Sequence, residues 1–313
     1  MAGSGIRRDA VTGAFGFTGR AIAAQLLEAD REVVTLARRV DVADPIASQL
    51  FVRPLDFTAP ARLADALSGV DTLYNTYWIR FPRGGSTFEG AVEQSSALFA
   101  AAREAGVRRI VHVSVVRADP AGATPYVRAK GELEERLKAS GLEWSIVRPT
   151  LTYGPSDILV NNLAWALRRP PLYGIPGRGR YPIQPVHVDD VARICLEAAE
   201  APAGHTVDAA GPDTMPYREM VAIVRRAVRS HSLVVPLPMA AVLAAARVLG
   251  VLVRDVVLTR NELLELTSGL LTSEAPPLGR IAFAPWVTAN ADALGRRWSS
   301  ELARNYRNAP PAP

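Results

Sequence analysis

Short apolar segments alternate with longer segments of helical periodicity over roughly the first 150 residues. Strands are expected at residues 8–12, 32–37, 51–55, 71–75, 109–114 and 144–149, and helices at residues 21–28, 60–67, 88–105 and 129–139. The strand at 109–114 is apolar enough to be buried on both faces. Strands that alternate with helices at this spacing predict an α/β fold, a doubly wound parallel sheet with helices on both faces.

The pattern changes after about residue 154. Helices are expected at residues 158–167, 188–199, 217–228, 239–270 and 286–306, and a loop rich in proline and glycine at 170–182. We therefore expect a core over residues 1–155 and a smaller, mainly helical lobe over residues 156–313, from which residues 182–200 return to the core. Open parallel sheets bind ligands at the carboxyl ends of their strands, so the site is expected there.

Three glycines follow the first expected strand and precede the first expected helix, at positions i, i+3 and i+6. Gly13 allows a tight turn, Gly16 lets the backbone approach a pyrophosphate, and Gly19 lets helix and strand pack closely. Thr18 would add a hydroxyl to this site or would cap the helix. A glycine-rich turn without a ligand gives the same letters. The residues assigned to this phosphate-binding turn are Gly13, Phe15, Gly16, Phe17, Thr18 and Gly19.

Composition narrows the class of protein. Of 313 residues, 49% are hydrophobic and 21% are charged, which suits a globular α/β protein. The net charge of +5 comes from scattered arginine pairs rather than a basic block, so no nucleic-acid partner is expected. The single cysteine, Cys195, fits a reducing, cytoplasmic location. We expect no secretory signal and no membrane span. The sequence contains no grouping with metal-ligand spacing and no Gly-x-Ser-x-Gly elbow.

Further motifs follow the glycine turn and strengthen the signal by their order and spacing. The full set is Thr12-Gly13-x-x-Gly16-x-x-Gly19, Asp56-Phe57, Asn75, His112-Val113-Ser114, Tyr126-x-x-x-Lys130, Arg148-Pro149 and residues 185–192. Through these motifs the chain resembles, over roughly residues 5–200, the short-chain dehydrogenase/reductase superfamily in its extended or atypical branch. Within that branch it is similar to proteins of the NAD-dependent epimerase/dehydratase type and to the NADPH-binding accessory subunit of respiratory complex I.

The resemblance implies a Rossmann-like fold and hydride transfer between NAD(P) and a small organic substrate. Tyr126 and Lys130 are one helical turn apart and share a face. The Lys130 ammonium would favour the phenolate form of Tyr126 and hold the nicotinamide ribose, while Tyr126 would move a proton. Ser114 is the third candidate catalytic residue, although family members usually place the serine at the position of Val115. A chance tyrosine–lysine pair is the alternative.

Other positions are assigned to the cofactor. Arg38 lies about 20 residues after the glycine turn, where an arginine suits the 2′-phosphate of NADP and a carboxylate would suit NAD. Arg39 follows it and no acidic residue occupies this position, so NADP is expected, with NAD possible. Asp56 would reach the adenine amino group and Phe57 would flank its ring, unless Asp56 only forms a turn. Asn75 and Pro149 complete the expected cofactor site.

Two functions stay open at this stage. The first is an NADP(H)-dependent oxidoreductase or epimerase-like enzyme, in which Trp78, Arg80 and Phe81 either line the substrate pocket or pack beneath a loop. The second is a catalytically weak or inactive NADP(H)-binding structural or regulatory protein, because Val115 carries no hydroxyl. Its apolar residues 233–271 would then contact a membrane or a protein complex; otherwise they close the substrate lobe.

Overall fold

The computed structural model describes residues 7–38, 41, 43–169 and 171–306, and its contacts divide the chain into two units. Unit 1 comprises Met1–Arg80, Ser86–Pro149 and Val188–Ala209. Unit 2 comprises Phe81–Gly85, Thr150–His187 and Ala210–Pro313. The sequence placed the boundary near residue 155 and the returning segment at 182–200, whereas the contacts place them at residue 149 and at residues 188–209.

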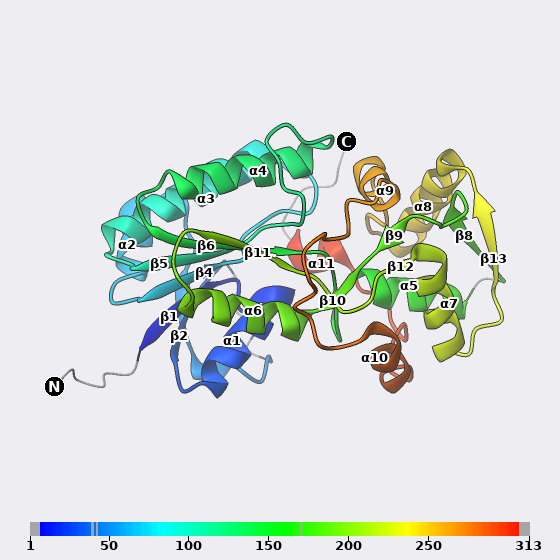
Figure 1. Cartoon of the computed structure of the whole chain (residues 1–313), viewed down its shortest axis with the longest axis horizontal. Coiled ribbons are helices and arrows are strands. Elements are labelled where there is room, and N and C mark those ends of the chain that lie inside the picture. The colour runs from blue at the N-terminus through cyan, green and yellow to red at the C-terminus, as the bar shows by residue number, and fades with distance from the viewer. Residues whose placement is uncertain (1–6, 39–40, 42, 170, 307–313) are drawn as a thin grey trace. The chain divides into compact units, whose positions relative to one another are not determined.

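A seven-stranded sheet forms the centre of unit 1 (Figure 1). Its order is β11-β6-β5-β4-β1-β2-β3, and every neighbouring pair is parallel. This confirms the predicted Rossmann-like α/β class. The strands are β1 (Arg8–Thr12), β2 (Glu32–Ala37), β3 (Leu50–Pro54), β4 (Thr72–Asn75), β5 (Arg109–Val113), β6 (Glu143–Pro149) and β11 (His205–Ala209).

Helices cover both faces of this sheet. Helices α2, α3 and α4 lie on one face, and α1 and α6 pack together on the other (Figure 1). Leu73, Ile110 and Ile146 of the central strands are completely buried beneath them, which explains why these strands are continuous apolar runs. The helices are α1 (Phe17–Glu28), α2 (Pro60–Ala66), α3 (Phe88–Glu104), α4 (Pro125–Lys138) and α6 (Val188–Glu200).

The strand order reverses direction at β1. From β1 the chain proceeds to β2 and β3 on one side, and β4 then pairs with β1 on the other side. The crevice at such a switch point lies at the carboxyl ends of the two strands, which here are Thr12 and Asn75. A ligand site is therefore expected at the segments that follow β1 and β4.

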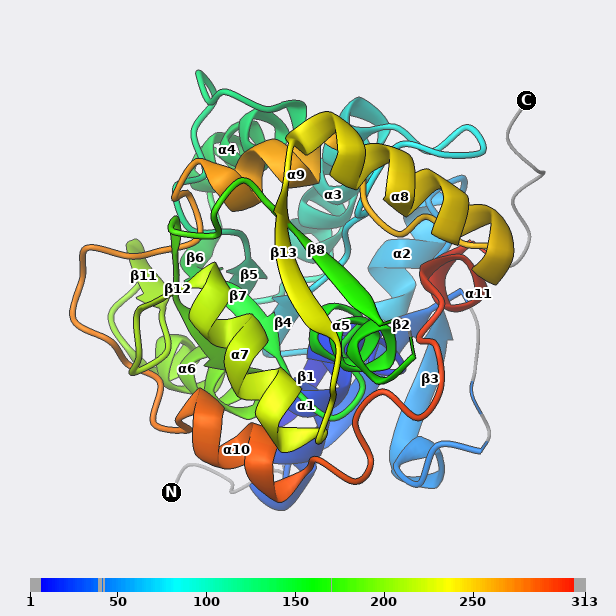
Figure 2. The ribbon, with the colours of Figure 1, turned by 90° about the vertical axis from the view of Figure 1, so that its right-hand side faces the viewer.

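Unit 2 is built from helices and short strand pairs around a second core, in which Tyr153, Phe283 and Val224 are completely buried. Strand β7 pairs with β10, β9 with β12, and β8 with β13. Figure 2 shows β13 beside β8, with α8 following β13. Among the described residues, no helix combines the length and apolarity needed to cross a membrane. The elements are β7 (Leu151–Tyr153), α5 (Leu159–Arg168), β8 (Leu172–Pro176), β9 (Pro182–Ile183), β10 (Pro185–His187), β12 (Met215–Pro216), α7 (Tyr217–Ala227), β13 (Leu233–Leu237), α8 (Met239–Val253), α9 (Arg260–Thr267), α10 (Phe283–Ala289) and α11 (Glu301–Asn305).

The single helix expected at 239–270 is wrong. Helix α8 ends at Val253, because the next residue, Arg254, has a left-handed φ of 53°. Helix α9 begins at Arg260 with a capping box formed by Thr259 and Glu262. Asp255 turns inward between them and accepts hydrogen bonds from the Trp298 indole (2.9 Å) and the Glu301 backbone N–H (2.9 Å). Hydrophobicity alone concealed this break, although the spacing Thr259-x-x-Glu262 signals it.

The helix expected at 286–306 is also wrong, because α10 and α11 are separated by turns. Strand β11 was missed. It lies at the edge of the sheet, and its sequence His205-Thr206-Val207-Asp208-Ala209 contains few apolar residues. An edge strand needs little apolar surface, so periodicity gives a weak signal there.

Candidate functional site

The glycine turn closes tightly at the end of β1. The Gly13 N–H donates to the Leu36 carbonyl oxygen (2.9 Å), and the Gly16 N–H donates back to the Gly13 carbonyl oxygen (2.8 Å). Gly13 has a φ of 70°, a conformation that side chains with a Cβ rarely adopt. Gly16 is the N-cap residue, so α1 starts at Phe17, four residues earlier than expected. Thr18 therefore lies inside the helix and does not cap it.

Helix α1 approaches this turn so closely that no side chain fits between them. A Cβ on Gly19 would lie 2.3 Å from the Gly13 carbonyl oxygen, and one on Gly16 would lie 3.1 Å from it. The first turn, Phe17-Thr18-Gly19-Arg20, contains no carboxylate, and its first N–H groups have no acceptor within the helix. A helix start of this kind attracts anions, so the turn fits a dinucleotide pyrophosphate.

A buried polar network joins the ends of β1, β4 and β5. Asn75 accepts a hydrogen bond from the Thr12 hydroxyl (3.1 Å), and its amide nitrogen lies 3.1 Å from His112 Nδ1. The Thr12 hydroxyl also accepts from the backbone N–H of Thr76 (2.7 Å). Asn75 is therefore used within the protein, and its expected contact with the cofactor would have to come from neighbouring backbone.

The end of β2 carries the exposed Arg38, while Arg39 lies outside the described residues. The Arg38 cation opposes the effect of burial, which raises the pKa of Tyr77. The Tyr77 ring packs on Phe57 with 4.9 Å between ring centroids. Asp56 accepts hydrogen bonds from the backbone N–H (3.0 Å) and hydroxyl (2.6 Å) of Thr58, which is the turn-forming role left open above.

Tyr126 and Lys130 lie in the first two turns of α4, which Thr124 caps by accepting from the Val127 N–H (3.3 Å). The Lys130 ammonium donates to the Val113 carbonyl oxygen (3.0 Å) and lies 4.2 Å from the centroid of the Trp78 ring. Tyr126 packs edge-on against the same Trp78 ring (6.0 Å between centroids). Trp78, which follows β4, thus brings the two residues together.

Lys130 is buried, and this burial lowers its pKa to about 7, against the effect of the Glu134 carboxylate, which raises it. Trp78 adds a cation–π contact that favours the ammonium. The amine therefore titrates near neutral pH. This balance could not be predicted from sequence, because it depends on the depth of Lys130 beneath Trp78.

Ser114 lies at the end of β5, and its hydroxyl donates to the buried carboxylate of Glu134. The same carboxylate binds the guanidinium of Arg148 on β6, with Nε 2.9 Å from Oε1. Pro149 follows Arg148, and its carbonyl oxygen accepts from the Val116 N–H (3.0 Å). Glu134 was not among the expected site residues, although its position one turn after Lys130 indicates that it faces the same side of the helix.

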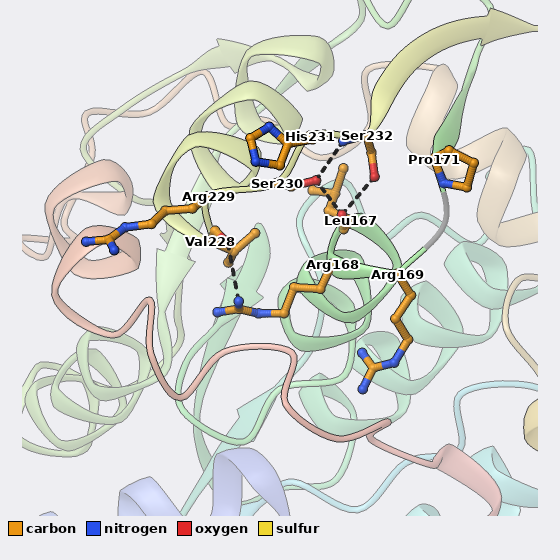
Figure 3. A pocket seen from close by; sticks show the side chains of 9 residues that line it. All are labelled: Leu167, Arg168, Arg169, Pro171, Val228, Arg229, Ser230, His231 and Ser232. Carbon is orange, nitrogen blue, oxygen red and sulfur yellow. Dashed lines mark hydrogen bonds between the residues drawn. The ribbon is translucent and has the colours of Figure 1, made fainter.

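Two further features are not assigned to the site. Phe81 stacks on Tyr306 within unit 2 (5.3 Å between centroids), a packing role. A hollow of about 390 Å³ is lined by residues 167–169, 171 and 228–232. Figure 3 shows the side chains that line it. Its Arg168 guanidinium donates to carbonyl oxygens, including that of Val228 (3.2 Å), and the Ser232 hydroxyl donates to that of Leu167 (2.8 Å). Among the described residues no group of three or more His, Cys, Asp or Glu could hold a metal ion.

The chain belongs to the NAD(P)H-binding family, whose pattern matches residues 13–202. This range runs from the glycine turn to just beyond α6. The match confirms the expected NAD(P) cofactor and the resemblance to extended and atypical short-chain dehydrogenases/reductases. The protein is therefore an NAD(P)H-binding member of this family.

Three curated relatives extend this result. An uncharacterized protein of Mycobacterium tuberculosis is 30% identical over 226 residues, which cover 70% of this chain and 23% of that protein, so the chain spans about a quarter of its length. The (4-alkanoyl-5-oxo-2,5-dihydrofuran-3-yl)methyl phosphate reductase of Streptomyces griseus is 28% identical, covering 69% of this chain and 72% of that one. The mitochondrial NADH dehydrogenase (ubiquinone) 1 alpha subcomplex subunit 9 of Arabidopsis thaliana is 27% identical, covering 76% and 62%.

Solved structures share the fold. The triphenylmethane reductase of Citrobacter superposes with a TM-score of 0.72 at 17% identity, covering 92% of this chain and 100% of the other. The NADPH-dependent quinone oxidoreductase of Escherichia coli, solved with NADPH, superposes with a TM-score of 0.71 at 21% identity, covering 90% and 98%. At these identities the likeness establishes the fold and not the substrate.

The first prediction concerns Gly19. Gly19→Ala should weaken NADPH binding by at least about tenfold, because its methyl group forces the turn away from α1. Gly90→Ala in α3 is the matched control, since its Cβ would meet only the flexible Thr87 side chain at 3.3 Å. Calorimetric titration with NADPH measures both. Parent-like affinity in Gly19→Ala would show that the turn does not hold the pyrophosphate.

The second prediction concerns Lys130 and pH. Below pH 7 the amine is protonated in both folded and unfolded chains, so the full cost of burying the ammonium opposes folding. Between about pH 7 and its ordinary pKa the unfolded chain keeps the proton and the folded chain releases it, so stability rises with pH by up to about 1.4 kcal/mol per unit. Chemical denaturation from pH 6 to 9 should therefore show the parent gaining stability relative to Lys130→Met. A difference that does not change with pH would contradict this.

Proposed function

We propose that this protein is an NADP(H)-dependent oxidoreductase that transfers a hydride to or from a small organic substrate. The observation that carries the proposal is that Tyr126 and Lys130 both contact the Trp78 ring. Trp78 follows β4, one of the two strands at the switch point. A proton donor, a cation and a dinucleotide turn in one unit are the parts that such a reaction needs. The Streptomyces relative, a reductase, supports the same reaction class.

Each residue has a defined part in the proposal. The turn at residues 13–19 holds the pyrophosphate, and NADPH, when bound, supplies the hydride. Tyr126 gives a proton to the substrate oxygen in the reduction, or removes it in the reverse direction. Lys130 is the neighbouring cation that favours the phenolate, and its ammonium would turn from the Val113 carbonyl to the ribose hydroxyls.

Ser114 has a weaker part. Its hydroxyl hydrogen is donated to Glu134, so it can reach a substrate oxygen only after that bond is broken. The next residue, Val115, offers no hydroxyl. Loss of one hydrogen-bond donor to a developing oxyanion costs roughly 3 kcal/mol, or about a hundredfold in rate. We therefore propose a reaction in which Tyr126 is the principal proton donor and turnover is slow.

The second candidate function is a binding protein without significant turnover. Two observations favour it: the engagement of Ser114 by Glu134, and the likeness to a subunit named as part of an NADH dehydrogenase. In this case residues 233–271 would contact a membrane or a protein complex. A cytoplasmic location belongs to both candidates and rests on the single, buried Cys195.

The third prediction tests the enzymatic function. Tyr126→Phe should lower NADPH-dependent turnover by at least about a hundredfold with unchanged NADPH affinity, because only the proton donor is lost. The matched control is Tyr173→Phe in unit 2, which removes a hydroxyl bonded to Tyr217 and should keep parent-like turnover. The assay follows NADPH absorbance with a panel of carbonyl and quinone compounds. A parent that binds NADPH but oxidises none of it across the panel would favour the binding protein.

The fourth prediction tests the choice of cofactor. The parent should bind NADPH more tightly than NADH, and Arg38→Ala should narrow the gap, because the exposed guanidinium at the end of β2 is available for a 2′-phosphate. Arg53→Ala at the exposed end of β3 removes an equal charge from the same sheet and is the control. Calorimetry with both nucleotides measures the effect. Equal affinities in the parent would overturn the proposed preference.

A further inference from the structure

Helix α8 carries aliphatic side chains on its outer side as well as on its inner side. Val248, Val251 and Leu252 are 64%, 79% and 75% exposed. Val242 is buried, and Leu243, Leu249 and Val253 are partly buried. A surface helix usually carries polar residues on its outer side, so the exposed aliphatic side chains of α8 need an explanation. Figure 2 shows the length of α8 along the surface of unit 2.

The exposed residues form one continuous stripe. Residues 244, 245, 248, 251 and 252 follow the i, i+3 and i+4 spacing of a single helix face, and all five are exposed. Alanine, valine and leucine occupy these five positions. We call this stripe the outer face of α8. A single exposed apolar side chain would need no explanation, but five adjacent ones form a patch that does.

Positive charge borders the outer face. Arg247 is exposed one turn before Val251, and the exposed Arg254 is the C-cap residue that directly follows the helix. Arg178 is exposed and lies near the start of α8. The hydrogen bond from the adjacent Gly177 N–H to the Leu237 carbonyl oxygen (2.8 Å) places it there. An apolar stripe with arginines at its border complements a surface that is apolar within and anionic at its rim.

No opposing carboxylate accompanies these arginines over residues 229–261. The single acidic residue in this range is Asp255, which is buried and accepts hydrogen bonds from the Trp298 indole and the Leu302 N–H (3.0 Å). Its charge is used to anchor the start of α11. No carboxylate close to Arg247 and Arg254 in the sequence therefore opposes their charge.

We propose that the outer face of α8 docks on the surface of an anionic lipid bilayer. The aliphatic side chains enter the boundary of the acyl chains, and Arg247 and Arg254 contact the lipid phosphates. A helix of 15 residues is about 22 Å long, shorter than the roughly 30 Å of a bilayer core, so it lies along the surface. This docking site is independent of the proposed reaction.

The test is sedimentation of the full chain with vesicles of phosphatidylcholine, with and without phosphatidylglycerol. The parent should bind the anionic vesicles and not the neutral ones. Val251→Asp with Leu252→Asp should reduce binding by at least about tenfold, because two charges would enter the acyl boundary. Arg247→Gln with Arg254→Gly should reduce it by about fivefold per arginine, glycine being suited to the positive φ at residue 254.

The matched control is Phe51→Asp with Leu172→Asp, which adds the same charge at exposed apolar residues outside α8 and should leave binding unchanged. Because all substituted side chains are exposed, circular dichroism should show parent-like folding. Sedimentation velocity without lipid determines whether the parent and the variants are monomers or dimers. Failure of the parent to bind anionic vesicles would overturn the proposal. So would a parent dimer that the α8 aspartates dissociate, because a second copy would then cover this face.

Discussion

The architecture of unit 1 depends on one close contact, that between the end of β1 and the first turn of α1. Gly13 and Gly19 allow the helix to start directly against the turn, where a single methyl group would lie 2.3 Å from a carbonyl oxygen. This contact sets the path of α1 beneath the sheet, where it packs on α6. The same contact directs unsatisfied N–H groups toward the crevice at the switch point. The fold and the proposed cofactor site therefore depend on the same two glycines.

The second constraint is the satisfaction of polar groups at the strand ends. Thr12, Asn75 and His112 come from three neighbouring strands, and their hydrogen bonds fix how the ends of β1, β4 and β5 are aligned. Burial lowers the pKa of His112 well below its ordinary value, and the nearby Lys130 lowers it further, so the imidazole stays neutral. A network of this kind specifies a geometry more than it adds stability.

Sequence patterns predicted those elements whose cause is local. Strands β2, β4 and β5 were found because burial demands apolar residues in them, and β1 was found from the glycine turn that follows it, where only glycine fits. The start of α1 was expected four residues too late, because Gly19 has a low helix propensity and its presence argued against a helix at residues 17–20. Strand β11 was missed because its edge position places few demands on composition. The hydrogen bonds of Asp56 and the engagement of Ser114 by Glu134 depend on tertiary placement, which no local pattern encodes.

The remaining question is how a site with a valine at the usual serine position can activate Tyr126. Burial of Lys130 outweighs the Trp78 ring and Glu134, which favour the ammonium, so its pKa falls to about 7 and both forms of the amine are populated at neutral pH. A ligand that brings hydroxyl acceptors or negative charge to Lys130 shifts this equilibrium toward the ammonium. In the proposed reaction the added positive charge then favours the phenolate form of the neighbouring Tyr126. Cofactor binding and activation of the proton donor would thereby be linked through a single buried lysine, without a contribution from Ser114.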